Sequence, residues 1–179
     1  MFKDFKYSFL FLGKFLAIYF CANILYGIFI DSYTAQPDPI TYWVTNQTAQ
    51  FQNILGVASS IKINEGMKSI SMQSNGDGVI NVFEGCNGLN VMIVFVAFLV
   101  AYGGSTRRML WFLPLGLLII HLFNLLRIML LYVAAQQNTH YFYYIHKYFF
   151  TAALYLVVIV LWIIWVTKLN TDKKKQVEE

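Results

Sequence analysis

Four stretches of this chain are apolar and close to the length of a membrane-crossing helix, and this limits the fold more than any other feature. They run from about Phe9 to Ile30, Gly88 to Tyr102, Met109 to Val133 and Tyr148 to Val166. A helix needs roughly 20 mostly apolar residues to cross a hydrocarbon layer about 30 Å thick. The second stretch is short, and it reaches this length only if its helix begins close to Cys86.

The composition agrees with a polytopic membrane protein. Of the 179 residues, 58% are hydrophobic and only 12% are charged, whereas a soluble domain has about 25% charged residues. The first apolar stretch begins after basic residues, as a signal peptide does. Its apolar part is long, however, and no clear small-x-small cleavage site follows Ile30. We therefore expect an uncleaved first helix.

The basic residues predict that both termini face the cytoplasm. In this orientation nine basic residues lie inside and three lie in outer loops, which fits the positive-inside rule; the inner ones are Lys3, Lys6, Lys14, Arg107, Arg108, Lys168 and Lys173 to Lys175, and the outer ones are Lys62, Lys68 and Lys147. We expect a multi-pass protein of the cytoplasmic (inner) membrane. Its net charge of +4 is accounted for by contact with the lipid bilayer, without nucleic acid.

The segment from Asp31 to Gly85 is expected to lie on the outer face. Asp38 and Pro39 predict the start of a helix, and the aromatic residues Tyr42 and Trp43 predict that this helix lies at the membrane interface. Short strands are then expected around Ile61 and Ile63, Ile70 and Met72, and Val79 to Phe83, separated by the turn-rich segments 64–66 and 74–78.

The predicted fold class is therefore an all-α transmembrane bundle of about four helices with a small extracytoplasmic α/β cap. The expected parts are an N-terminal helix over 1–30, an outer segment over 31–85, a three-helix core over 86–168 and a basic cytoplasmic tail over 169–179.

Three reactive side chains, Cys86, Arg127 and His146, lie on different apolar stretches but at similar predicted depths. Counted from the cytoplasmic ends at Tyr102, Met109 and Lys168, they are 16, 18 and 22 residues away. At about 1.5 Å per residue these separations are roughly 24, 27 and 33 Å, so all three are expected near the outer boundary of the hydrocarbon layer.

Each of these side chains also has a purely structural interpretation. Cys86 could form a disulfide with Cys21, but Cys21 is expected on the order of 14 Å deep in the first span, so we favour a free Cys86 and a packed Cys21. Arg127 could extend to lipid phosphates, although a cation in a span more often has a partner or a task. His146, beside several tyrosines, could belong to an interfacial aromatic belt.

The other histidines suggest no cofactor. His121 lies in the middle of a span, where a hydrogen bond to a neighbouring helix is favoured over haem binding or proton transfer. His140 is expected in a loop with no specific role. We expect neither a metal nor another cofactor, because the chain contains no zinc-binding motif, no paired cysteines and no carboxylate cluster.

The local sequence motifs around these three side chains are more specific than any one of the three residues alone. Glu84-Gly85-Cys86-Asn87-Gly88-Leu89 precedes the second span, Asn124-Leu125-Leu126-Arg127-Ile128 lies in the third, and His146 opens the fourth. This order resembles the exosortase and archaeosortase family of membrane cysteine transpeptidases, whose pattern is a cysteine followed by a small polar residue and glycine, then N-x-x-R, then a histidine. The resemblance covers about Val82 to Trp165.

The chain departs from the family pattern in two respects. Asn87 stands where Ser or Thr is expected in many members, and the chain has four apolar stretches where larger members have more. The chain is therefore similar to a compact, single-module branch of the family.

The resemblance implies a mechanism and a class of substrate. Cys86 would attack a peptide carbonyl near the outer end of a substrate's own C-terminal transmembrane helix, and His146 would act as general acid and base. Arg127 would stabilise the oxyanion or hold the substrate, with support from Asn124 and Gly88. The partners would be membrane-anchored proteins with such a helix.

Two other classes of function remain open from the sequence. The chain could be a non-enzymatic scaffold or assembly protein whose polar residues join helices. It could also be a small haem- or ion-handling membrane protein with His121, Asn124 and Arg127 along a polar path.

Overall fold

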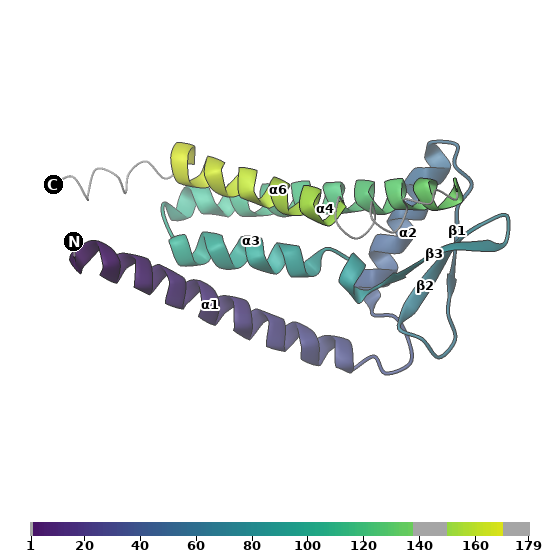
Figure 1. Cartoon of the computed structure of the whole chain (residues 1–179), viewed down its shortest axis with the longest axis horizontal. Helices are drawn as coiled ribbons and strands as arrows, with labels where there is room; N and C mark the ends of the chain where they lie inside the picture. Colours follow the sequence, from purple (N-terminus) through teal and green to yellow (C-terminus); the bar gives the residue numbers. More distant parts are fainter. Residues whose placement is uncertain (1, 138–149, 170–179) are drawn as a thin grey trace.

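The computed structural model describes residues 2–137 and 150–169. Among these residues, four helices run side by side along the long axis, with a small sheet and one further helix at one end (Figure 1). The four long elements are α1 (Phe2–Asp31), α3 (Leu89–Tyr102), α4 (Thr106–Gln136) and α6 (Phe150–Ile164), and the π-helical turn η3 (Trp165–Leu169) continues α6.

Within the described residues, three helices are long and apolar enough to cross a membrane: they lie at Lys6–Asp31, Thr106–Gln136 and Thr151–Leu169. The second predicted stretch forms α3, an apolar helix of 14 residues. It does not start at Cys86 as full length would require, because Gly88 has a left-handed backbone with φ of 82° and interrupts the helical path. Cys86 instead ends a separate 3-10 turn, η1 (Glu84–Cys86).

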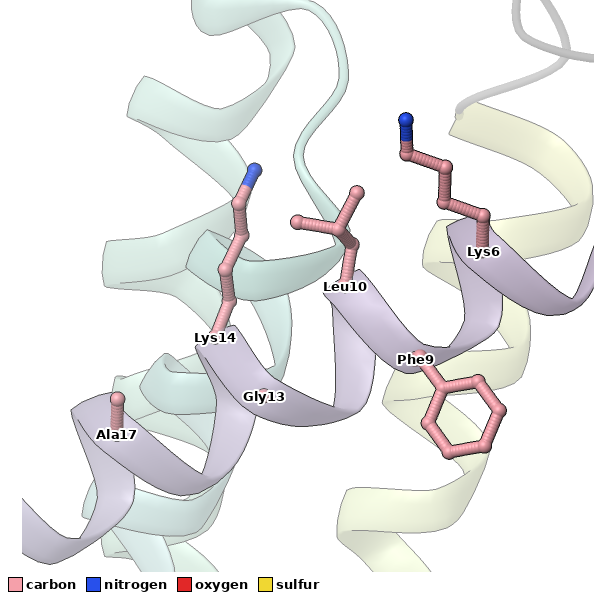
Figure 2. Close-up of a pocket in the computed structure, with 6 residues that line it drawn as sticks. All are labelled: Lys6, Phe9, Leu10, Gly13, Lys14 and Ala17. Atoms are coloured by element: carbon pink, nitrogen blue, oxygen red, sulfur yellow. The ribbon is translucent and has the colours of Figure 1, made fainter. Parts of the chain in front are cut away.

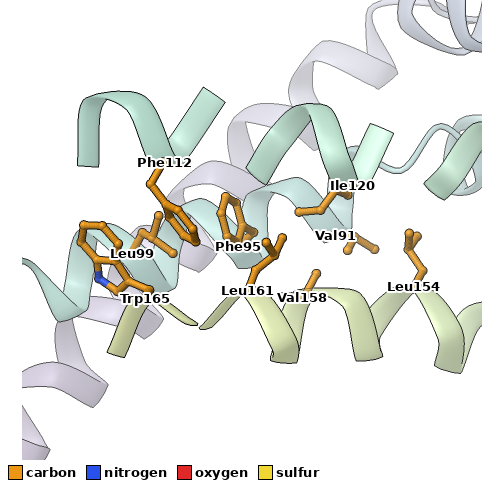
Figure 3. Close-up of a cluster of buried hydrophobic side chains, with 9 residues drawn as sticks. All are labelled: Val91, Phe95, Leu99, Phe112, Ile120, Leu154, Val158, Leu161 and Trp165. Atoms are coloured by element: carbon orange, nitrogen blue, oxygen red, sulfur yellow. The ribbon is translucent and has the colours of Figure 1, made fainter. Parts of the chain in front are cut away.

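The bundle is held together by a core between α3, α4 and α6 (Figure 3). Nine buried apolar side chains form it: Val91, Phe95, Leu99, Phe112, Ile120, Leu154, Val158, Leu161 and Trp165. Gly116 of α4 lies directly against the Phe95 ring, so that any Cβ at this position would overlap the ring. The absence of a side chain at Gly116 therefore allows α3 and α4 to approach closely.

Helix α1 packs on α3 at the edge of the bundle. The Phe11 ring meets the rings of Phe98 and Tyr102 edge to face, with centroids 5.5 and 6.0 Å apart. The rest of α1 is largely uncovered, and Cys21 is exposed. The expectation that Cys21 is a packed side chain was wrong, because α1 contacts the bundle along one side and Cys21 lies off that side.

Helix α2 (Pro39–Ile54) lies across the end of the bundle, steeply inclined to α4 (Figure 1). It begins where the sequence predicted. Asp38 is its N-cap, and its carboxylate accepts hydrogen bonds of 3.0 Å from the backbone N–H groups of Ile40 and Thr41. Proline is favourable at the first helical position, because its missing N–H would have no partner there.

The sheet has three antiparallel strands in the order β1 (Ser60–Ile63), β2 (Ser69–Ser74) and β3 (Asp77–Phe83). These match the predicted short strands. The turn between β2 and β3 has positive φ at Asn75 and Gly76, as tight hairpins require. Ile70, Met72 and Val82 bury the inner face of the sheet against α2 and α4.

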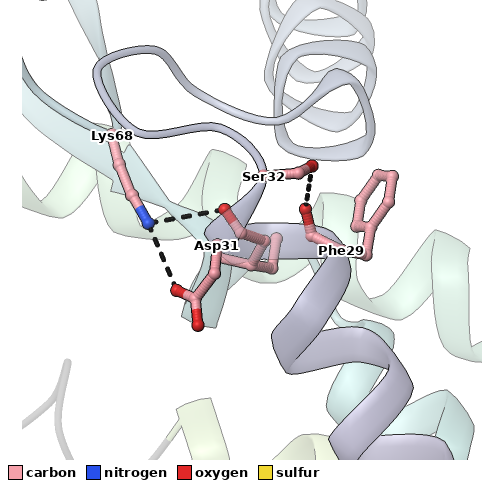
Figure 4. A network of polar contacts seen from close by, with 5 residues as sticks. Phe29, Asp31, Ser32 and Lys68 are labelled. Carbon is pink, nitrogen blue, oxygen red and sulfur yellow. Dashed lines mark hydrogen bonds and ion pairs between the residues drawn. The ribbon is translucent and has the colours of Figure 1, made fainter.

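Two contacts fix the sheet to the helices. The Tyr132 hydroxyl near the end of α4 lies within hydrogen-bond distance of the carbonyl oxygens of Ala58 and Gln73, at 2.8 and 3.0 Å. Lys68, just before β2, donates to the carbonyl of Ile30 at 3.4 Å and pairs with Asp31 at 3.5 Å (Figure 4). A cation is favourable at this position because the last carbonyls of α1 carry partial negative charge.

Candidate active site

Cys86 lies where the sheet and the bundle meet. It is at the end of η1, its side chain is only 6% exposed, and it packs in one apolar cluster with Val44 and Ala49 of α2 and Leu125 and Ile128 of α4. Both cysteines are free thiols, so the structure agrees with the free Cys86 that the sequence favoured.

Asn124 of α4 joins the η1 turn to the third predicted span. Its side-chain amide donates a hydrogen bond of 3.0 Å to the carbonyl oxygen of Cys86, and the residue is fully buried. Gly88 makes this approach possible, because a Cβ there would lie 2.9 Å from Asn124 Cγ. Glycine at 88 is therefore required both by its left-handed backbone and by its neighbour.

Arg127 lies one helical turn beyond Asn124. Its Nη1 donates to Asn124 Oδ1 at 3.3 Å, which is the contact expected from the N-x-x-R spacing. Its Nε is buried and has no hydrogen-bond partner among residues 2–137 and 150–169. One side-chain amide thus connects the Cys86 backbone to the guanidinium.

Asn87 has the most extensive contacts of the residues next to Cys86. Its side chain is 2% exposed and bonds to three elements: Nδ2 donates to the hydroxyls of Tyr26 in α1 and Thr41 in α2, at 2.8 and 3.2 Å, and Oδ1 accepts from the N–H of Leu89 in α3, at 2.9 Å. Asn87, which departs from the family pattern, thus makes several defined contacts.

Sequence reasoning missed the polar face that α2 turns toward the bundle. Thr41, Thr45, Thr48 and Gln52 are all buried, and the hydroxyls of Thr45 and Thr48 donate to carbonyls of the preceding turn, at 2.7 and 2.9 Å. These bonds satisfy the hydroxyls and allow the face to be buried. The spacing 41, 45, 48, 52 follows the helical repeat, so the signal was present in the sequence.

The histidines fall into two groups. His146, the predicted acid and base, and His140 lie outside the described residues. His121 stacks on Trp43 of α2, with ring centroids 4.9 Å apart, and its Nε2 lies 2.7 Å from Gln47 Oε1. It therefore has the helix-bridging contact that the sequence favoured.

A groove elsewhere in the described part of the chain lies away from Cys86. An open groove of about 750 Å³ lies along α1, lined by Lys6, Phe9, Leu10, Gly13, Lys14 and Ala17, with both lysines pointing to the same side (Figure 2). All its lining residues belong to α1, so it does not include Cys86. No group of three or more His, Cys, Asp or Glu side chains that could hold a metal occurs in the described part of the chain.

Comparison with known proteins gives a family match. The family model for transmembrane exosortases matches residues 5–165, a range that contains Cys86, Asn124, Arg127 and His146. Neither the curated proteins nor the solved structures give a match. The family model covers most of the chain, including the sheet, the first two candidate membrane-spanning helices of the described residues and most of the third. The chain therefore belongs to the transmembrane exosortase family.

Proposed function

We propose that this exosortase is a membrane-embedded cysteine transpeptidase that uses Cys86 to cleave proteins near the outer end of their C-terminal transmembrane helix. Family membership supports the general class, a membrane transpeptidase in protein sorting. The observation that carries the specific proposal is the bridge made by Asn124, which bonds to the Cys86 carbonyl and to the Arg127 guanidinium.

In the proposed reaction the Cys86 sulfur attacks the carbonyl carbon of the scissile peptide bond. The thiolate is the reactive form, and the thiol proton passes to His146, whose role remains a prediction. The carbon–nitrogen bond then breaks, and the amine leaves with the proton returned by His146. The resulting thioester is attacked by an acceptor amine, hydroxyl or water, which releases the Cys86 thiol.

Arg127 is assigned to the developing negative charge on the substrate oxygen. Its buried Nε has no partner in the described parts of the chain, while Nη1 is held by Asn124. A guanidinium that is fixed in place is what oxyanion stabilisation requires. The same group also suits the binding of a substrate carbonyl before the reaction.

The distribution of charge supports a protein of the inner membrane with both termini in the cytoplasm. In this orientation the active site lies on the extracytoplasmic side. Arg107 and Arg108 begin α4 and Lys168 lies in η3, at the end of the bundle farthest from the sheet, whereas Lys62 and Lys68 belong to the sheet region (Figure 1). Basic residues favour the cytoplasmic side of a membrane. Cys86 lies next to β3, at the opposite end of the bundle from Arg107 and Arg108.

A reporter protein with a C-terminal transmembrane helix and a basic tail tests this proposal. Cys86→Ala and Cys86→Ser should abolish release of the helix, and Arg127→Ala should lower the rate about a hundred-fold or more, as is typical for loss of one oxyanion donor. Cys21→Ala is the matched control and should cleave normally, because Cys21 is exposed on α1. Full cleavage by Cys86→Ala would refute the proposal, and silent Cys86→Ser would favour a scaffold.

A further inference from the structure

The turn that carries Cys86 is held by side chains from three other elements. Asn124 of α4 bonds to the carbonyl of Cys86 at 3.0 Å. Tyr26 of α1 donates from its hydroxyl to the carbonyl of Glu84 at 3.3 Å, and the same hydroxyl accepts from Asn87 Nδ2 at 2.8 Å. Tyr26 therefore holds the turn on both sides of the nucleophile.

Thr41 adds a second connection. Its hydroxyl accepts from Asn87 at 3.2 Å, and its backbone N–H is capped by Asp38 in the first turn of α2. Through Asn87, the position of Cys86 thus depends on α1 and on the start of α2, which are 61 and 46 residues away in sequence.

Asn87 does more than begin a helix. Gly88 is the N-cap of α3, and Asn87 precedes it with a local turn bond in which Oδ1 accepts from the N–H of Leu89. That bond needs only the oxygen of the side chain. The two bonds made by Nδ2 go to other helices, so they serve a different purpose. A serine could also accept from Leu89, but its single hydroxyl cannot donate to two acceptors.

From these contacts we propose that Asn87 and Tyr26 are positioning residues, which orient the Cys86 sulfur for attack by holding its turn against α1 and α2. This rests on the proposed role of Cys86 as nucleophile. It also accounts for an asparagine where the family pattern has a shorter polar residue. Asn87 donates to both Tyr26 and Thr41, whereas a serine could donate to only one of them.

Two single variants and their combination test the pair. Asn87→Ser keeps a group that can accept from the N–H of Leu89 but removes the bonds to Tyr26 and Thr41. Tyr26→Phe removes the bond to Asn87 from the other side, together with the bond to the Glu84 carbonyl, and leaves the bond between Asn87 and Leu89 intact. Tyr19→Phe, two helical turns earlier in α1, is the control for loss of a hydroxyl. The full-length proteins are compared for kcat, KM and thermal stability with the reporter substrate.

Positioning predicts that each single variant lowers kcat about tenfold, since small misplacements of reacting groups slow catalysis strongly, while KM and Tm stay near those of the parent. The double variant should lose less than the product of the two single losses, because the two substitutions share the bond between Tyr26 and Asn87, although each also removes one bond of its own. The proposal would be overturned if both single variants kept the parental kcat, or if the loss of kcat in the double variant equalled the product of the two single losses. A fall in Tm that matches the fall in kcat would also overturn it, because the residues would then act on stability alone.

The failure of this proposal can be separated from failure of the proposed function. Cleavage by the Cys86→Ala protein would show that Cys86 is not the nucleophile, and the proposed function would then be refuted. Inactive Cys86→Ala together with fully active Asn87→Ser and Tyr26→Phe would leave the nucleophile in place and reject only the positioning pair.

Discussion

The side-chain amide of Asn124 donates a hydrogen bond to the carbonyl oxygen of Cys86, although 38 residues separate the two in the chain. The other end of the same amide accepts from Arg127. One buried side chain therefore links the turn of the proposed nucleophile to the proposed oxyanion donor.

Asn124→Ala is expected to lower the cleavage rate about tenfold to a hundred-fold, because it frees the Cys86 turn and the guanidinium at the same time. Initial rates with the reporter substrate measure this effect. Asn23→Ala is the control, since the Asn23 amide bonds to Tyr19 O within its own helix and should change the rate little. Parental activity in a well-folded Asn124→Ala protein would show that the hydrogen bonds of Asn124 to Cys86 and Arg127 are not needed for cleavage.

Gly88→Ala is expected to inactivate the enzyme far more than Gly66→Ala. Both positions have positive φ, 82° and 72°, so both substitutions strain the backbone by roughly 1–2 kcal/mol. Only at position 88 does the new methyl group meet Asn124, while Gly66 faces open space. Cleavage rates of the two variants, compared at equal amounts of folded protein, measure the difference. Equal losses would show that the contact with Asn124 has no functional weight.

Gly116→Ala is expected to destabilise the bundle by about 1–3 kcal/mol, the usual range for overpacking a core, because the added methyl group overlaps the Phe95 ring. Gly13→Ala is the matched control: Gly13 also lies within a helix but has no neighbouring atom within 4 Å of the added group. Thermal unfolding in detergent should show a lower Tm for the first variant only. An unchanged Tm for Gly116→Ala would contradict the close packing of α3 and α4.

The outer face of α2 is expected to lie in the membrane interface. Most of its buried residues are polar, whereas Trp43, Phe51 and Ile54 are exposed, the reverse of a helix that faces water. Trp43 also stacks on His121 of the membrane-spanning α4. Aromatic residues of this kind are enriched at the membrane surface.

Nitroxide labels test this placement in a Cys21→Ser, Cys86→Ser background. Labels at Phe51 and Ile54 should be accessible to oxygen and protected from a water-soluble nickel complex, whereas a label at Gly76 in the hairpin turn should show the reverse. Strong nickel relaxation at Ile54 would place the face in water, and spin–spin broadening would show contact with a second copy.

Local rules in the sequence determined most of the elements. Asp38 and Pro39 fixed the start of α2, because a carboxylate accepts the first N–H groups of a helix and proline needs no partner there. Alternation at Ile61, Ile63, Ile70 and Met72 gave the strands, because successive side chains of a strand face opposite sides. Long apolar runs gave the membrane helices, since the thickness of the bilayer sets their length.

The sequence also identified Cys86, Asn124 and Arg127 as candidates, through their order and through helical spacing. The contact between Arg127 and Asn124 followed from that spacing alone. His146 remains a prediction of the sequence, outside the described residues.

Only the tertiary structure decided how distant groups meet. The pairing of Tyr26 with Asn87, the approach of Asn124 to Gly88 and the burial of the threonine face of α2 depend on how helices pack against one another. Hydrophobic patterns specify which residues avoid water, but they leave the rotation and height of each helix open. Those two variables are fixed by close packing and by buried hydrogen bonds between segments far apart in the chain.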